Sequence, residues 1–215
     1  MRIAHLSDWH NGFLKIINEV EKVNPDIIVC TGDMVNRNTT DFSKIYILLK
    51  KLCKIAPVLY SLGNHELDNQ FYNVLKRYIV KSGAILLDNE IFTFNNINFI
   101  GASLKKTCYK KNNSYKNLDK ITVKDLPLLP TGYNILLAHN PLFFKTYARY
   151  GADYVLSGHV HGGLIRLPLL GGVFSPERKL FPKYYYGHYQ TGKTQMNVSK
   201  GLNSHFSNKI PVIVI

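Results

Sequence analysis

The chain has 215 residues, of which 46% are hydrophobic and 12% aromatic, ordinary values for a folded soluble protein with one large core. Its 27 Lys and Arg against 14 Asp and Glu give a formal charge of +13, which favours anionic partners such as nucleotides, nucleic acid or acidic lipid headgroups. The alternative is a Lys-rich background that serves only solubility, since most lysines are scattered along the sequence. The exception is a basic, Tyr- and Asn-rich segment at residues 103–120, which predicts an exposed loop.

Cysteine usage argues against a protein held by disulfides or by a cysteine-bound metal, and hydropathy argues against a membrane-spanning protein. Cys30, Cys53 and Cys108 are odd in number, widely spaced and form no CxxC, which indicates reduced thiols that bind no metal. No apolar run approaches membrane-spanning length, and residues 2–6 already predict a strand rather than a signal peptide. The sequence as given therefore predicts a cytoplasmic protein.

The first third of the chain repeats a strand, a polar turn and a helix. This order predicts a parallel sheet with right-handed crossovers, in which ligands gather beyond the carboxyl ends of the strands. Asp41 is the expected N-cap of the second helix. The expected strands span residues 3–6, 26–30 and 57–62, and the expected helices span residues 13–23, 42–52 and 68–83. The polar residues at the three strand ends are Asp8, His10, Asp33, Asn64 and His65.

The rest of the chain predicts further strands, and no linker or repeat divides it, so we expect a single domain over residues 1–215. Residues 91–94 and 97–101 predict a hairpin around the two-residue turn Asn95-Asn96. A strand at residues 134–138 leads to His139, and a short helix at residues 142–150 follows. The remaining strands are expected at residues 154–156, 184–186, 195–198 and 211–215.

The segment Gly158-His159-Val160-His161-Gly162-Gly163 has the layout of a metal site. Residues two apart in extended backbone project the same way, so His159 and His161 can enter one site while Val160 points away. Two histidines that merely occupy a polar turn would give the same sequence pattern, so this pair alone does not decide between a metal site and an ordinary turn.

Five blocks in chain order together resemble the calcineurin-like metallophosphoesterase superfamily. They are Asp8-Trp9-His10, Gly32-Asp33, Gly63-Asn64-His65-Glu66, His139, and Gly158-His159-Val160-His161. The resemblance implies an α/β protein built as an αββα sandwich, in which two mixed β-sheets are flanked by helices. It also implies hydrolysis of a phosphoester by metal-bound hydroxide at a dinuclear centre.

The resemblance further implies a role for each residue. One metal would take Asp8, His10, Asp33 and His161, and the other would take Asp33, Asn64, His139 and His159, with Asp33 as the bridge. His65 would act over the substrate phosphate, Glu66 would orient His65, and Asn64 would also contact substrate. Imidazole, carboxylate and amide ligands without thiolate suit Mn, Fe, Zn or Ni, and the family likeness favours Mn with Fe or Zn.

The residues after the last histidine narrow the resemblance to one bacterial branch. Gly162-Gly163-Leu164-Ile165-Arg166-Leu167-Pro168 is similar to membrane-associated phosphoesterases and UDP-2,3-diacylglucosamine pyrophosphohydrolases, and Arg166 is a candidate phosphate contact or a structural ion-pair partner. A phosphodiester or pyrophosphate is the expected substrate. Because of the positive charge, a nuclease or a cyclic-nucleotide phosphodiesterase is the alternative hypothesis, and peripheral contact with a membrane is possible. A scaffold without catalysis is the third hypothesis, and no obligate protein partner is expected.

Overall fold

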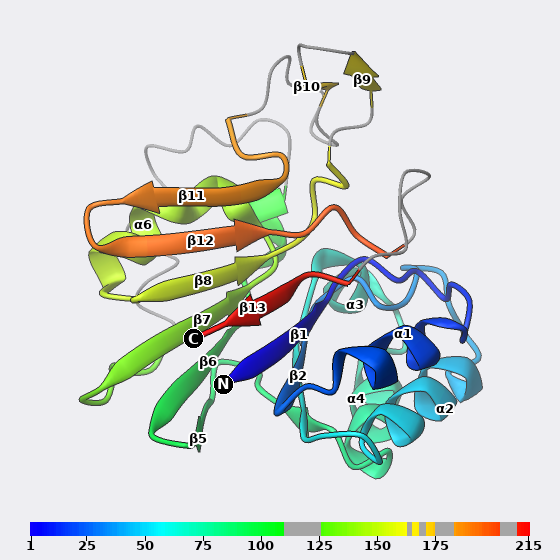
Figure 1. Ribbon diagram of the computed structural model, residues 1–215. Helices are drawn as coiled ribbons and strands as arrows, with labels where there is room; N and C mark the ends of the chain where they lie inside the picture. The colour runs from blue at the N-terminus through cyan, green and yellow to red at the C-terminus, as the bar shows by residue number, and fades with distance from the viewer. Residues whose placement is uncertain (110–125, 163–164, 168–170, 175–182, 203–209) are drawn as a thin grey trace.

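Two β-sheets form the centre of the protein, and a third small sheet of two strands lies apart from them (Figure 1). The computed structural model describes residues 1–109, 126–162, 165–167, 171–174, 183–202 and 210–215, and at 107, 165–167 and 171–174 the backbone only. Most of the basic segment expected at residues 103–120 therefore lies outside the described residues.

The first sheet has the order β13-β1-β2-β3-β4. Its strands are β1 (Arg2–Leu6), β2 (Ile27–Thr31), β3 (Val58–Ser61), β4 (Ile85–Leu86) and β13 (Val212–Val214). Strands β1 to β4 run parallel, as the repeated strand–turn–helix pattern predicted, and β13 pairs antiparallel with β1. The last strand of the chain thus closes the sheet beside the first.

The second sheet has the order β11-β12-β8-β7-β6-β5 and is also mixed. Its strands are β5 (Ile91–Phe94), β6 (Ile97–Ala102), β7 (Tyr133–Ala138), β8 (Tyr154–Ser157), β11 (Gly187–Thr191) and β12 (Thr194–Val198). The predicted hairpin of β5 and β6 is confirmed, and Asn95 and Asn96 both have the positive φ that its tight turn needs. Strands β9 (Ile165–Leu167) and β10 (Gly171–Phe174) form the small sheet.

Helices cover the outer faces of the two sheets, so the predicted αββα sandwich is confirmed (Figure 1). On the first sheet lie α1 (Ile16–Val23), α2 (Ser43–Leu52) and α4 (Tyr72–Lys81), and on the second lie η2 (Pro141–Phe143) and α6 (Phe144–Tyr150). Short α3 (Asn64–Asp68) and η1 (Lys106–Tyr109) lie near the carboxyl edges of the sheets. None of the helices in the described part of the chain has the length and hydrophobicity needed to cross a bilayer.

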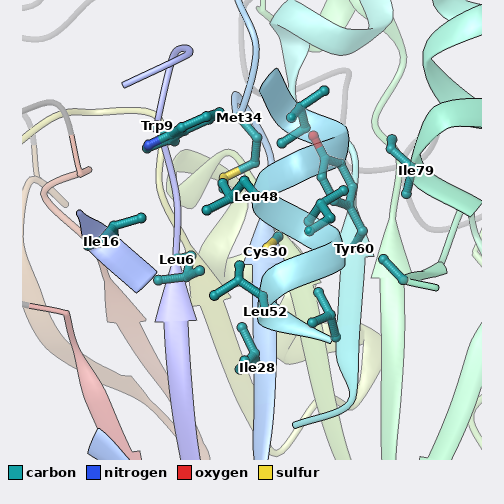
Figure 2. Close-up of a cluster of buried hydrophobic side chains, with 14 of the residues drawn as sticks. Leu6, Trp9, Ile16, Ile28, Cys30, Met34, Leu48, Leu52, Tyr60 and Ile79 are labelled. Atoms are coloured by element: carbon teal, nitrogen blue, oxygen red, sulfur yellow. The ribbon is translucent and has the colours of Figure 1, made fainter. Parts of the chain in front are cut away.

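Three apolar layers hold this arrangement together. Residues that alternate along β1 and β2 face either the helices or the other sheet, so that Leu6 packs under α2 while Ile3 packs between the sheets. Figure 2 shows Leu48 and Leu52 of α2 against the first sheet, and Trp9 and Met34 at the strand ends. The apolar layer therefore continues directly under the loops that follow β1 and β2.

Two expected elements differ from the structure. The helix expected at residues 68–83 begins only at Tyr72 as α4, and the separate helix α3, which was not expected, ends at Asp68; between them the Asn69 side chain bonds the Thr39 carbonyl and the Phe71 amide while the Asn69 backbone is extended. The strand expected at residues 184–186 is wrong, because the Tyr189 hydroxyl binds the backbone there and folds it into a turn. A smaller difference concerns α2: its N-cap is Phe42, while the Asp41 carboxylate accepts the Ser43 amide from one residue earlier.

Candidate metal centre

The polar residues that follow five different strands meet where the carboxyl edges of the two sheets adjoin. Asp8 and His10 follow β1, Asp33 follows β2, and Asn64 and His65 begin α3 after β3. His139 follows β7, and His159 and His161 follow β8. Backbone hydrogen bonds from Asp8 to Gly32 and from His10 to Asp33 continue the pairing of the first two strands into their loops.

Three of these residues form a first group of ligand atoms, called here group one: Asp8, His10 and His161. One donor atom from each lies within 4.8 Å of the others. The His161 Nε2 is 3.4 Å from Asp8 Oδ1, and the rings of His10 and His161 stack with centroids 5.2 Å apart.

Asp33, His139 and His159 form group two, and all three are buried. The His139 Nε2 is 3.1 Å from Asp33 Oδ2 and 3.9 Å from Asp8 Oδ1, so the two groups adjoin. The His159 backbone amide donates to the Asp8 carboxylate at 3.1 Å, which ties the loop after β8 to the loop after β1. The arrangement offers two neighbouring ligand sets rather than one.

Five of the candidate ligands have left-handed backbone. The φ values are +54° for Asp8, +49° for His10, +53° for Asp33, +72° for His159 and +49° for His161. Every other non-glycine residue with positive φ in the described part of the chain is an asparagine. Such conformations are costly for these side chains and collect at functional sites, where the surrounding structure enforces them.

Two glycines leave room for the carboxylates. A Cβ on Gly63 would stand 2.3 Å from Asp33 Oδ1, and a Cβ on Gly158 would stand 1.7 Å from the Ser7 hydroxyl and 2.4 Å from Asp8 Oδ2. Backbone and carboxylate therefore pack closer than any side chain allows.

The centre carries two buried carboxylates whose charge needs compensation. Burial alone would raise the pKa of Asp8 and of Asp33, but neighbouring histidines outweigh it and hold both pKa values below normal. Burial would lower the pKa of His139, yet Asp33 and Asp8 raise it to about 10. Among the described residues, the only side chains with a titratable nitrogen within 4 Å of these two carboxylates are histidines. The site therefore attracts positive charge, which a divalent cation supplies in place of protons.

The chemistry of the donor atoms fits such a cation. The buried Asn64 Oδ1 has no hydrogen-bond partner, an expensive state unless another group binds it, and His139 Nε2 has only the Asp33 carboxylate as an ion-pair partner at 3.1 Å. The other ring nitrogen of His139 lies 2.7 Å from the Thr31 carbonyl, and His10 Nδ1 lies 3.0 Å from Asn36 Oδ1. Both contacts place a ring proton on Nδ1, so that a cation which displaces any proton on Nε2 finds that nitrogen as its ligand, as metal-binding histidines require.

His65 lies at the rim of group one and is oriented by Arg37. Burial lowers the pKa of His65 to about 4 against the opposing effect of Asp33, so its ring is neutral at neutral pH. Its Nδ1 accepts the Arg37 backbone N–H at 3.2 Å, which places the ring proton on Nε2. The Arg37 guanidinium lies 3.4 Å from that Nε2. Two donors cannot bond to each other, so both can share an external acceptor such as a phosphoryl oxygen.

Glu66 contacts backbone rather than His65, which corrects the expectation that it orients that ring. Its buried carboxylate accepts the amides of Asp33, Met34, Val35 and Gly63 and the hydroxyl of Tyr60. The hydrogen bond described for the His65 ring comes from the Arg37 backbone amide instead. Glu66 thus holds the loop that presents Asp33 against the start of α3.

The remaining predicted residue, Arg166, lies in β9, and its side chain is outside the described residues. Sequence reasoning missed Asn36, Arg37 and Tyr109, which contact His10, His65 and the rings of group two. The position of Asn36 and Arg37 directly after the Asp33 turn was the available signal. Tyr109 had no such signal, because its segment read only as a basic loop.

A two-sheet sandwich with two adjoining His and carboxylate groups at its carboxyl edge defines a candidate metal-binding protein. The profile of the calcineurin-like phosphoesterase family matches residues 1–163, and the chain belongs to this family. Family membership makes the protein a hydrolase of phosphoesters at a dinuclear metal centre.

Curated relatives agree with this assignment. The chain is 30% identical to the uncharacterized metallophosphoesterase YkoQ of Bacillus subtilis, over 95% of this chain and 72% of that protein. It is 30% identical to the uncharacterized metallophosphoesterase Cj0846 of Campylobacter jejuni, but spans only 53% of that protein. It is 25% identical to phosphodiesterase YaeI of Escherichia coli, over 86% of this chain and 66% of that protein.

Solved structures share the fold at low sequence identity. TT1561 of Thermus thermophilus superposes with a TM-score of 0.61 at 10% identity, covering 98% of this chain and 97% of that one. A dimetal phosphatase from Danio rerio superposes with a TM-score of 0.55 at 12% identity, covering 95% of this chain and 88% of that one. At such identities the likeness concerns the fold alone.

Proposed function

We propose that this protein cleaves a phosphodiester or a pyrophosphate with two divalent cations. The observation that carries the proposal is the pair of adjoining ligand groups, joined by the 3.9 Å approach of His139 Nε2 to Asp8 Oδ1. Donor sets this close would hold two cations at the spacing of about 3.5–4 Å that dinuclear hydrolases use.

Group one would hold one cation, and group two together with the Asn64 amide oxygen would hold the other, with Asp33 between them. Bound cations would supply Lewis acidity toward the phosphoryl oxygens and lower the pKa of a coordinated water. Oxygen and imidazole donors suit Mn, Fe, Zn or Ni, and we favour Mn with Fe or Zn.

His65 and Arg37 would bind the phosphoryl group beside group one. The Nε2–H of His65 would donate to the leaving oxygen or to a phosphoryl oxygen, and it lies next to the ligand His10, with ring centroids 4.7 Å apart. The Arg37 guanidinium would add a full positive charge at the same acceptor. Arg166 stays a candidate for a second phosphate contact.

Nucleic acid or a cyclic nucleotide is the second candidate substrate, because two observations favour it. The chain carries a formal charge of +13, and it is 24% identical over 72% of its length to a protein named for DNA double-strand break repair, Mre11 of Methanococcus maripaludis. Since the present chain covers only 46% of that relative, the likeness is limited to the shared region.

A panel of phosphomonoesters, diesters, nucleotide pyrophosphates and single-stranded DNA, assayed with added Mn, tests the proposal. We expect turnover of diesters or pyrophosphates above monoesters, and salt-sensitive binding only if DNA is the substrate. Asp33→Ala should lose both metal content and activity. His65→Ala should keep the metal but lose about 10²–10⁴-fold in turnover, the usual contribution of a positioned proton donor. Full activity of His65→Ala on every diester would contradict the role given to this histidine.

A further inference from the structure

Tyr109 packs against the rings of group two, whereas His65 packs against His10 of group one. It ends η1, and its ring lies 5.3 Å from the His159 ring and 6.2 Å from the His139 ring, measured between centroids. The interplanar angles are 68° and 46°, so the tyrosine packs edge-on and tilted against two ligands of group two.

The position of Tyr109 is fixed by contacts from three directions. The Cys108 amide donates to the Lys105 carbonyl within the turn, and the Asn140 side-chain amide donates to the Cys108 carbonyl at 3.4 Å. Lys106 reaches Asp68 of α3 at 3.9 Å. The tyrosine is therefore held both by the residue that follows His139 and by the helix that carries Asn64.

The Tyr109 hydroxyl is buried and has no hydrogen-bond partner among the described residues. Phenylalanine would fill the same space without the cost of an unpaired buried hydroxyl. Another buried atom in the same state, Asn64 Oδ1, belongs to a candidate metal ligand. These two unpaired atoms, together with the packing of the Tyr109 ring on His159 and His139, indicate that their partners arrive with the groups that bind at the centre.

We propose that the Tyr109 hydroxyl donates a hydrogen bond to a phosphoryl oxygen of the substrate bound beside group two. A phenol is a donor at neutral pH, and the oxygens of a phosphoester are acceptors. The phosphoryl group would then be held from two sides, by Arg37 and His65 beside group one and by Tyr109 beside group two. This inference rests on the proposed hydrolysis of a phosphoester, and it makes Tyr109 a catalytic residue that contacts substrate.

Tyr109→Phe tests the hydroxyl while it keeps the ring that packs on His139 and His159. The Mn-loaded variant should keep the metal content of the unmodified protein. Its affinity for inorganic phosphate, measured by calorimetry, should fall about fivefold to tenfold, the usual effect of one lost hydrogen bond. Its kcat/KM on the best substrate should fall by at least the same factor.

Tyr150→Phe is the matched control, because the Tyr150 hydroxyl bonds the Pro127 carbonyl at the end of α6. It should leave phosphate affinity and kcat/KM unchanged. Unchanged phosphate affinity and kcat/KM in Tyr109→Phe would overturn the inference, as would loss of metal from that variant. Absence of turnover in the metal-loaded unmodified protein would instead overturn the proposed hydrolysis, so the two failures are distinct.

Discussion

Replacing Glu66 by glutamine tests how the Asp33 loop is held. The carboxylate accepts five hydrogen bonds with two oxygens: Oε1 from Met34, Val35 and Tyr60, and Oε2 from Asp33 and Gly63. In Glu66→Gln one oxygen becomes an NH₂ group, which donates and does not accept. If the glutamine oxygen takes the place of Oε1, it still accepts from Met34, Val35 and Tyr60. The NH₂ group then takes the place of Oε2, and the backbone N–H groups of Asp33 and Gly63 face a donor instead of an acceptor.

The expected loss follows from these two buried amides. Each unpaired buried donor costs about 1–3 kcal/mol, so the variant should lose about 2–6 kcal/mol of its free energy of unfolding. A domain of this size shifts its Tm by about 2–4 °C per kcal/mol, which gives a decrease of about 5–20 °C. Because Asp33 is one of the two residues that lose an amide contact, metal content should fall as well.

Thermal unfolding with and without Mn, together with metal analysis, measures both effects. The exposed Glu21→Gln on α1 is the matched control, since its carboxylate is at the surface and should leave Tm within about 1 °C. A Glu66→Gln variant with the Tm and metal content of the unmodified protein would show that Glu66 does not hold this loop.

Three further predictions concern the centre itself. Gly158→Ala should lose metal and stability, because its Cβ would stand 2.4 Å from Asp8 Oδ2; normal metal content in mass spectrometry would contradict this packing argument. Arg37→Ala should raise KM about threefold to tenfold on charged phosphoesters, because it removes the proposed phosphate contact. The exposed control Arg77→Ala should leave KM unchanged. Equal KM values in the two variants would refute the phosphate contact. Removal of metal by a chelator should lower Tm by about 5–10 °C, and added Mn should restore it. The reason is that a ligand present at a hundred times its Kd stabilises the folded protein by about 2.7 kcal/mol. A Tm that changes with neither chelator nor Mn would argue against a bound cation.

Strand ends and their polar residues could be predicted from sequence because the signals are local. Apolar runs followed by Asp8-Trp9-His10 or Gly63-Asn64-His65 define both the strand and the residue that leaves it. The parallel order of β1 to β4 then brings these ends together without further information. The candidate ligands were therefore predictable in position, and their residue types suggested the chemistry.

The supporting contacts could not be predicted, because they depend on geometry between loops. Glu66 follows His65 in sequence, yet its carboxylate points to the amides of residues 33–35, some thirty residues earlier. Tyr109 meets His159 across fifty residues. Likewise, Asn69 ends α3 through a side-chain bond to Thr39, which no periodicity in residues 68–83 reveals.

The pairing of β13 with β1 places both described chain ends at one location. Met1 hydrogen-bonds to Ile215, and the two ends lie together in Figure 1. The five residues of β1 then separate this location from Asp8 by about 16 Å, given the rise of a strand. A purification tag, fluorophore or surface tether attached at residue 1 or 215 would thus start away from the edge that carries the candidate metal centre. A short linker that joins residues 1 and 215 would allow a circular permutant, with its new ends in the Asn95-Asn96 turn.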